Sequence, residues 1–244
     1  MLEKFFAFIG SPNRDKYLAI REEIIVSEQY DPYSSDLDHA NALLNAGEYR
    51  EARESISGSM PNLLLSPSAH YLLSLIAGKL NDQKSAELEG AIASSCVKGI
   101  LATGDGSHEK PYIVVRMSDE YDVAHCLGKQ NTEQSLISDG DKCYDLLRCG
   151  DGSELWFEIT DVLRRRQQIS TAVYQVRLTQ VGSSRVKVMS LIREIWGLPP
   201  SEAKGLIDSP QPLLGTIKFR QWKEIQTKFT EAGAAIEIDG PTSP

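Results

Sequence analysis

The sequence predicts an α+β protein of several domains, because its local patterns change twice along the 244 residues. In the first third, apolar residues recur at helical spacing and strand signals are nearly absent. After Gly99, short β-branched runs alternate with tight turns, and from Val173 a strand precedes amphipathic helices. We therefore expect three domains: a helical one at 1–99, a small α+β one at 100–168, and a third, with strands and helices, at 172–239.

The composition is that of an acidic globular protein. Apolar residues make up 41% and charged residues 25% of the chain, and the formal net charge is -8 at pH 7. Affinity for nucleic acids depends on clustered Lys and Arg, so this charge argues against direct nucleic-acid binding. No run approaches the roughly 18 apolar residues of a membrane span, and the opening MLEKFFAFIG is too short and too acidic for a secretory signal. We expect a cytoplasmic protein with no membrane partner.

The residues that most often bind metals are scattered. Four cysteines and four histidines occur without the close pairs of a zinc motif, and neither CxxC nor HExxH is present. We therefore expect reduced thiols, no metal ligands and no cofactor.

The first third contains two candidate helical hairpins. The stretch DLDHANALLNAGEYREARESI places apolar residues on one face of two helices, with NAG at the corner. A second pair, SPSAHYLLSLIAGKL and SAELEGAIASSCV, is separated by NDQ; here Ser66 can cap and Pro67 fits the first helical position. The segment ALLNAGEYREARESI resembles the tetratricopeptide family in its pattern of small and large residues, which are Ala42, Leu43, Gly47, Tyr49, Ala52 and Ile56. The resemblance implies protein binding or scaffolding.

The middle third is expected to form short strands and tight turns. PYIVVRM reads as a strand, SDEYDVAHCLG as a short helix, and CGDGSE as a hairpin turn between two further strands. Asp119, Glu120, His125 and Cys126 are of the types that perform acid–base or nucleophilic chemistry. An enzyme of unknown reaction seated here is one alternative, and it requires these side chains to converge in a deep pocket. We expect no catalytic residue, because neighbours such as His125 and Cys126 point about 100° apart on a helix.

The run RRRQQ, residues 164–168, is the one basic cluster of the chain. Short charge runs mostly face water, so we interpret it as a solvated linker. Association with RNA or the ribosome through this run and the basic face of the last domain is the other alternative.

The last third has a regular pattern. VYQVRLTQV alternates as a half-buried strand, and the next apolar stripe ends at Gly197, which suits a left-handed helix end. Pro200 fits the start of a second helix, on which Lys204 points away from the apolar side. A short extended PLLGTI, a third helix and the strand AAIEI follow. The apolar face of that third helix is formed by Phe219, Trp222, Ile225, Phe229 and Ala232.

This order closely resembles the C-terminal domain of the bacterial ribosomal stalk protein, from Tyr174 to Ile238. The resemblance rests on RVKVMSLIREIWGLPPSEAKGLI and FTEAGAAIEI, where the family shows Lys-Val-x-Val-Ile-Lys-x-Val-Arg, Gly-Leu, Glu-Ala-Lys and Glu-Ala-Gly-Ala. It implies a β-α-α-β-α-β domain whose first two helices form a face that recruits translation GTPases. Carried over position by position, that partner-binding face comprises Val186, Val188, Met189, Arg193 and Lys204.

The segment also departs from the family. Ser190 stands where the family has a lysine, Lys187 stands where it usually has alanine, and a stiff Gly-Leu-Pro-Pro replaces a flexible Gly-Leu-Gly-Leu. The dimerising helices and the long Ala/Gly-rich hinge of a stalk are missing. We therefore predict a non-enzymatic adaptor with a protein partner, either a translation GTPase or the ribosome, rather than a stalk protein.

Overall fold

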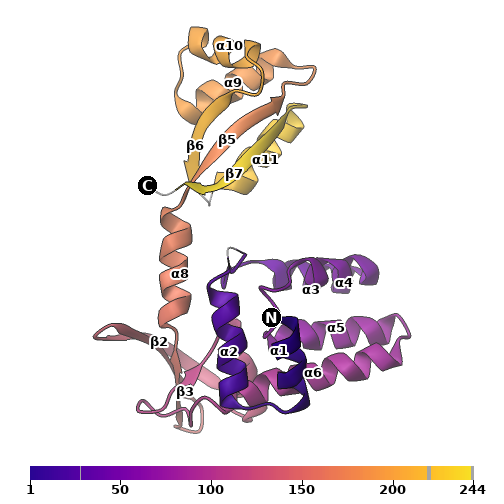
Figure 1. Cartoon of the computed structure of the whole chain (residues 1–244), viewed down its shortest axis with the longest axis vertical. Helices are drawn as coiled ribbons and strands as arrows, with labels where there is room; N and C mark the ends of the chain where they lie inside the picture. Colours follow the sequence, from indigo (N-terminus) through magenta and orange to yellow (C-terminus); the bar gives the residue numbers. More distant parts are fainter. Residues whose placement is uncertain (28, 219–220, 243–244) are drawn as a thin grey trace. The chain divides into compact units, whose positions relative to one another are not determined.

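The computed structural model describes residues 1–27, 29–218 and 221–242, and the chain divides into two compact units, Met1–Arg166 and Gln167–Pro244 (Figure 1). Each unit combines helices with one sheet, which confirms the α+β class. None of the helices in the described ranges is long and apolar enough to cross a membrane.

The helices of the first unit include the two hairpins that the sequence predicts. Gly47 is left-handed at the corner between α3 and α4, and the Ser66 side chain accepts a hydrogen bond from the Ala69 N–H at the start of α5. Pro67 occupies the first helical position, as expected. The helices are α1 (Leu2–Gly10), α2 (Arg14–Ile25), α3 (Asp36–Ala46), α4 (Tyr49–Gly58), α5 (Pro67–Lys79), α6 (Gln83–Leu101) and α7 (Ser118–Cys126).

The sheet of the first unit has the order β1-β4-β3-β2. Its strands are β1 (Tyr112–Ile113), β2 (Asn131–Asp139), β3 (Lys142–Cys149) and β4 (Glu154–Glu158). β3 and β4 form the predicted hairpin, with Gly152 at a φ of 82° in its turn. β2 pairs antiparallel with β3. The sequence pattern does not predict this strand, because its mostly exposed residues carry little apolar alternation.

One core joins the N-terminal helices to this sheet. Phe8 and Tyr17 from the first helices, Ile100 from α6 and Phe157 from β4 belong to the same buried cluster. Gly99 lies so close to Tyr17 and Phe8 that an added Cβ would come within 2.8 Å of both rings. The expected boundary between 1–99 and 100–168 therefore falls inside a packed core, because α6 contributes to both sides of it.

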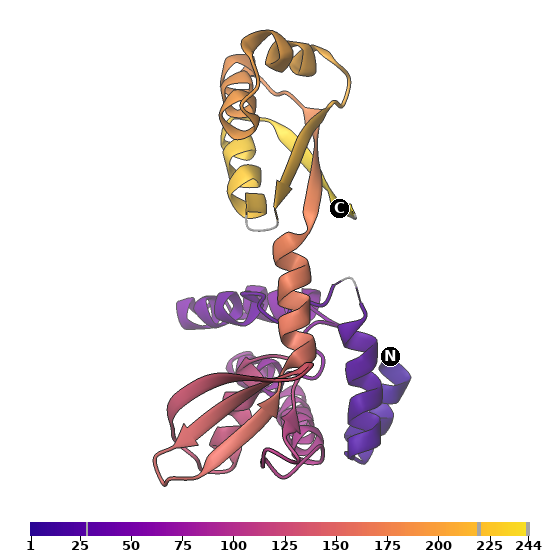
Figure 2. The ribbon, with the colours of Figure 1, turned by 90° about the vertical axis from the view of Figure 1, so that its left-hand side faces the viewer.

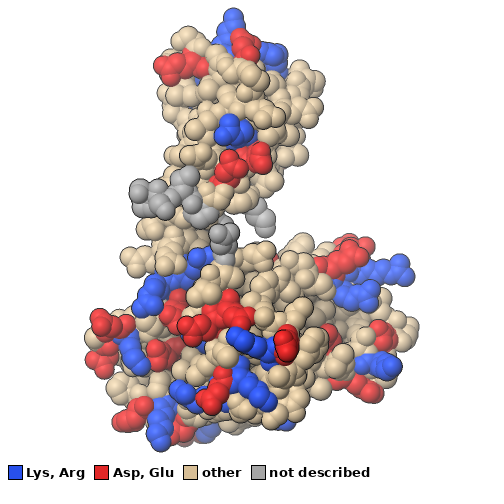
Figure 3. All heavy atoms as spheres, in the orientation of Figure 1, with Lys and Arg blue, Asp and Glu red and all other residues tan. Residues whose placement is uncertain are grey.

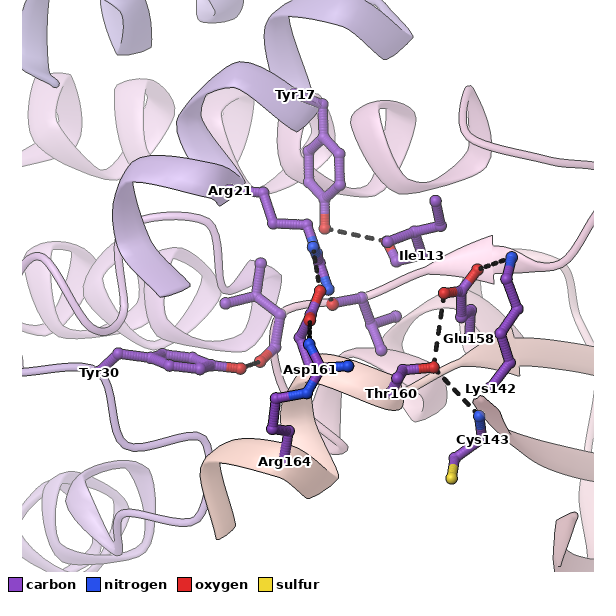
Figure 4. A network of polar contacts seen from close by, with 12 residues as sticks. Tyr17, Arg21, Tyr30, Ile113, Lys142, Cys143, Glu158, Thr160, Asp161 and Arg164 are labelled. Atoms are coloured by element: carbon purple, nitrogen blue, oxygen red, sulfur yellow. Dashed lines mark hydrogen bonds and ion pairs between the residues drawn. The ribbon is translucent and has the colours of Figure 1, made fainter. Parts of the chain in front are cut away.

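The start of α8 (Thr160–Thr171) is fastened to this core by a polar network (Figure 4). Arg21 is buried, donates from Nε to the Val114 carbonyl at 3.0 Å, and pairs with Asp161 at 3.0 Å. The Tyr30 hydroxyl donates to the Val115 carbonyl at 2.7 Å. These bonds connect α2 and the segment after it to the strand region and to α8.

The second unit has the predicted order of strand, two helices, strand, helix and strand. Its elements are β5 (Val173–Gln180), α9 (Arg185–Trp196), α10 (Pro200–Asp208), β6 (Leu213–Lys218), α11 (Trp222–Glu231) and β7 (Ala235–Thr242). The antiparallel sheet has the order β6-β5-β7, and Figure 2 shows α9 and α11 on one side of it. Phe219, expected on the face of the third helix, lies outside the described residues.

The core of the second unit includes Val176, Val188, Ile192 and Phe229, none of which is exposed. Gly197 ends α9 in the left-handed conformation, as predicted. At Gly215, with a φ of 151°, an added Cβ would lie 2.5 Å from the Trp196 ring. This glycine lets α9 approach β6 closely.

Candidate functional site

The α9–α10 pair is the surface on which the sequence places a docking site. The two helices contact each other, and an ion pair joins Arg185, the first residue of α9, to Asp208, the last residue of α10. The start of α9 therefore lies beside the end of α10.

Three of the expected partner-binding side chains lie along one side of α9, and a fourth, Lys204, lies on α10. Val186, Met189 and Arg193 are three and four residues apart, so they lie along one side of α9. Lys204 precedes Asp208 by four residues, and the Arg185–Asp208 pair brings this side of α10 next to α9. We name these four residues, Val186, Met189, Arg193 and Lys204, the α9–α10 face.

The α9–α10 face combines exposed charge with exposed apolar surface. Val186 is 74% exposed, Met189 is partly buried against the core, and Arg193 and Lys204 are exposed. Neither cation forms an ion pair with any other residue in the described ranges, whereas Arg185 is paired. Figure 3 shows basic side chains at the α9–α10 end of the second unit, with acidic side chains beside them. This arrangement suits an acidic partner surface with a small apolar contact.

Val188 does not belong to the α9–α10 face. Its side chain is 0% exposed and packs with Ile192 in the core. The residue-by-residue comparison with the stalk family assigned it to the partner-binding set, but in this structure a partner cannot reach it. Val188 supports the face from beneath.

The two positions where the chain departs from the stalk family lie on another side of α9. Lys187 and Ser190 line a shallow hollow between α9 and α11, together with Leu191 and Lys228. The positive charge of Lys187 therefore does not add to the α9–α10 face.

The four candidate catalytic residues of the middle segment do not converge. Asp119 and Glu120 are 0% exposed, whereas His125 and Cys126 are exposed and line a cavity together with Asp122. The deep shared pocket that an enzyme at these four residues would require is therefore not formed by them.

The buried carboxyl groups are instead held by the fold. Asp119 accepts backbone N–H bonds from Val115 at 3.2 Å and Arg116 at 3.0 Å, and burial raises its pKa to about 7. Burial, followed by the nearby Asp145 charge, raises the pKa of Glu120 to about 9. Within the described ranges, no group of three or more His, Cys, Asp or Glu side chains could hold a metal ion.

The basic run at 164–168 is helical, because it lies within α8, and it is largely exposed, as expected of a solvated run; the boundary between the two units falls between Arg166 and Gln167. Arg164 pairs with Asp161 at 3.0 Å, Arg165 donates to the Tyr30 carbonyl at 2.7 Å, and the Arg166 guanidinium lies 4.8 Å from the centre of the Tyr33 ring. The sequence showed the charges but not the residues from 30 to 33 that engage them. Arg165 is therefore engaged by the first unit, whereas Arg164 and Arg166 remain exposed.

Comparisons with known proteins address the second unit. The family model of the ribosomal protein L7/L12 C-terminal domain matches residues 174–239. Over 66 residues, the chain is 42% identical to large ribosomal subunit protein bL12 of Caldanaerobacter subterraneus subsp. tengcongensis, which is 27% of this chain and 53% of the relative. The same protein of Oceanobacillus iheyensis is 39% identical over 66 residues, 27% of this chain and 55% of the relative.

A third relative gives the same extent of match. The bL12 protein of Geobacillus kaustophilus is 41% identical over 66 residues, covering 27% of this chain and 54% of the relative. The chain thus spans about half the length of the curated relatives it matches. No solved structure matches. With the strand and helix order described above, these matches identify residues 174–239 as a C-terminal domain of the ribosomal protein L7/L12 family.

Proposed function

We propose that this chain is a non-enzymatic adaptor of the bacterial cytoplasm, whose second unit docks a translation GTPase or the ribosome through the α9–α10 face. The observation that carries the proposal is the match of residues 174–239 to the L7/L12 C-terminal domain, together with the unpaired cations Arg193 and Lys204 on exposed helices. The relatives are named as ribosomal proteins, which supports a partner in translation.

The face is suited to a transient contact. Exposed cations raise the rate at which an acidic partner is encountered, and they contribute less to the lifetime of the complex. The exposed Val186 side chain and the part of Met189 that reaches the surface supply the apolar contact that holds the partner after encounter. Association therefore depends on ionic strength.

The helical hairpins within residues 1–99 provide the second interaction module of the proposed adaptor. α3 with α4 and α5 with α6 are antiparallel pairs of the kind that tetratricopeptide-like repeats stack into protein-binding platforms. In this proposal the segment 100–168 completes their core and supports the chain that leads to the second unit.

The test measures binding of the full-length chain to intact ribosomes and to a panel of purified bacterial translation GTPases. The charge-reversed variant R193E/K204E is expected to associate with its partner about 10-fold or more slowly, because two attractive charges become repulsive. Dissociation is expected to change much less.

The matched control is K187E/K218E, which makes the same change of charge at two exposed lysines outside the α9–α10 face. It is expected to bind nearly as the parent chain does. Equal loss in both variants, or no binding by the parent chain to any member of the panel, would contradict the proposal.

A further inference from the structure

A cavity of about 550 Å³ lies between α5, α6 and α7 in the first unit. Sites for small molecules typically occupy roughly 300–1,000 Å³. α6 lines this cavity with the side that faces away from the core: Ile92, Cys96 and Ile100 are buried, while Ala93 and Val97 face the cavity. The helix is therefore apolar on two sides, and the unit covers only one of them.

The walls of the cavity are largely apolar. Pro67 and Tyr71 from α5 face Val97 and Leu101 from α6 across it. The Tyr71 side chain is 59% exposed, although it is large and mostly apolar. A ligand with an apolar body would remove this surface from water, which is worth about 25 cal/mol for each Å² buried.

The ionisable side chains that line the cavity differ in whether their hydrogen-bonding atoms are already engaged within the protein. The Asp122 carboxylate is engaged, because it accepts hydrogen bonds from the Ser68 N–H at 3.1 Å and the Ser68 hydroxyl at 2.7 Å. Lys98 and His125 line the same cavity, and within the described residues neither side chain forms a hydrogen bond or ion pair, although burial raises the pKa of the nearby Asp122 and the charge of His125 acts to lower it. The donors that remain for a ligand therefore come from side chains that carry positive charge when protonated.

We propose that the cavity between α5, α6 and α7 binds a small amphipathic carboxylate, with its apolar body against Tyr71, Val97 and Leu101 and its carboxylate on Lys98 and His125. A charge-assisted hydrogen bond from Lys98 fixes the end of the ligand that carries the charge. The site lies in the first unit and is independent of the α9–α10 face.

Cys126 supplies a direct reporter, because its exposed thiol lines the cavity while Cys96 and Cys149 are buried. Octanoate is the probe, added to the full-length chain, and the rate of alkylation of Cys126 by iodoacetamide is followed by peptide mass spectrometry. Octanoate is expected to slow alkylation of Cys126 several-fold and to leave Cys143, which does not line the cavity, unchanged. Octanol and octylammonium are expected to protect much less at equal concentration.

Two variants keep the proposal falsifiable. K98M is expected to weaken octanoate binding about 5- to 10-fold, the typical effect of losing one charge-assisted hydrogen bond. K84M is the matched control, since Lys84 is also an exposed lysine of α6 but does not line the cavity. S94W, a change at an exposed position of the cavity wall, is expected to block the probe while circular dichroism shows a folded chain.

Three results would overturn the proposal. The first is no protection of Cys126 at millimolar octanoate. The second is protection by octanol equal to that by octanoate, which would show an apolar hollow without preference for an anion. The third is an equal loss in K84M and K98M, which would show attraction to general surface charge.

Discussion

Glu120 and Asp145 form a buried carboxyl pair between α7 and β3. Their exposed fractions are 0% and 2%, and the Gln134 amide lies against both, with Nε2 2.7 Å from Asp145 Oδ2 and 3.4 Å from Glu120 Oε2. Two neighbouring carboxylates cannot easily both be ionised, so one retains a proton. Burial, followed by the Asp145 charge, raises the pKa of Glu120 to about 9, which identifies Glu120 as the partner that keeps the proton.

This pair predicts a pH dependence of stability. The unfolded chain ionises Glu120 above its ordinary pKa of 4.5, while the folded chain keeps it neutral up to about 9. The folded state therefore holds the extra proton, and the contribution of Glu120 to the free energy of unfolding falls as the pH rises through that window. E120Q removes the part of this pH dependence that Glu120 causes. It is expected to raise the free energy of unfolding of the first unit by about 2 kcal/mol at pH 8, and by much less at pH 5.

Urea unfolding at pH 5 and pH 8 measures this difference. The Gln amide retains a donor toward Asp145, so the variant is expected to fold normally. If the parent chain and E120Q have parallel pH dependences, Glu120 is not the protonated member of the pair.

At the residue scale, the sequence predicts only part of the candidate site. Arg193 and Lys204 are exposed as the helical spacing predicts, because spacing reports the side of a helix, and Val186, assigned from the family resemblance, is exposed as well. At Val188 the two kinds of sequence argument disagree. Its place in the apolar stripe of its helix predicts burial, whereas its position in the match to the stalk family assigned it to the partner-binding set; in the structure Val188 is buried. Burial depends on the facing elements, β5, β6 and α11, which spacing on one helix does not specify.

At the scale of the elements, the sequence predicts where helices end at a glycine, but it does not predict which distant segments of the chain pack against each other. Gly47 and Gly197 end helices in the left-handed conformation, a local requirement that the sequence shows directly. α8 was missed because its arginines are held by the segment around Tyr30, about 135 positions earlier in the chain. β2 was missed because pairing with β3, rather than its own apolar pattern, makes it a strand.

The Arg21–Asp161 pair, in which Arg21 is buried and Asp161 is 31% exposed, predicts which charge holds the start of α8 to the first unit. R21M removes one of the two partners of Asp161 and the donor to the buried Val114 carbonyl. It is expected to lower the free energy of unfolding of the first unit by roughly 2–4 kcal/mol. R164M removes only an exposed pair with the same Asp161, and is expected to cost less than about 0.5 kcal/mol.

Chemical denaturation of both variants at one pH gives the comparison. Similar losses in R21M and R164M would show that the buried network in Figure 4 does not secure the start of α8.

At the scale of the molecule, the two units have separate cores. The first unit buries one cluster around the helix–sheet junction and a second around α3, α4 and α5, while the second unit buries its own. The sequence predicted the first strand of the second unit, because a new alternating pattern starts at Val173, whereas the unit itself begins at Gln167, within α8. It did not predict that α6 and the middle strands share a core, since that depends on contacts between distant segments.

Separate cores predict two unfolding transitions in calorimetry of the full-length chain. I192A creates a cavity in the core of the second unit and is expected to cost about 2–5 kcal/mol there. Only one of the two transitions should move to lower temperature. A single transition that shifts as a whole in I192A would show that the units unfold together.

Methyl NMR of the full-length chain, titrated with the purified translation GTPase that binds it, is the most direct test of the docking claim. The methyl signals of Val186 and Met189 are expected to shift or broaden at the lowest partner concentrations, while those of the buried Val176 remain in place. Changes confined to Leu191, which faces the hollow between α9 and α11, or to the first unit, would contradict the α9–α10 face as the docking surface.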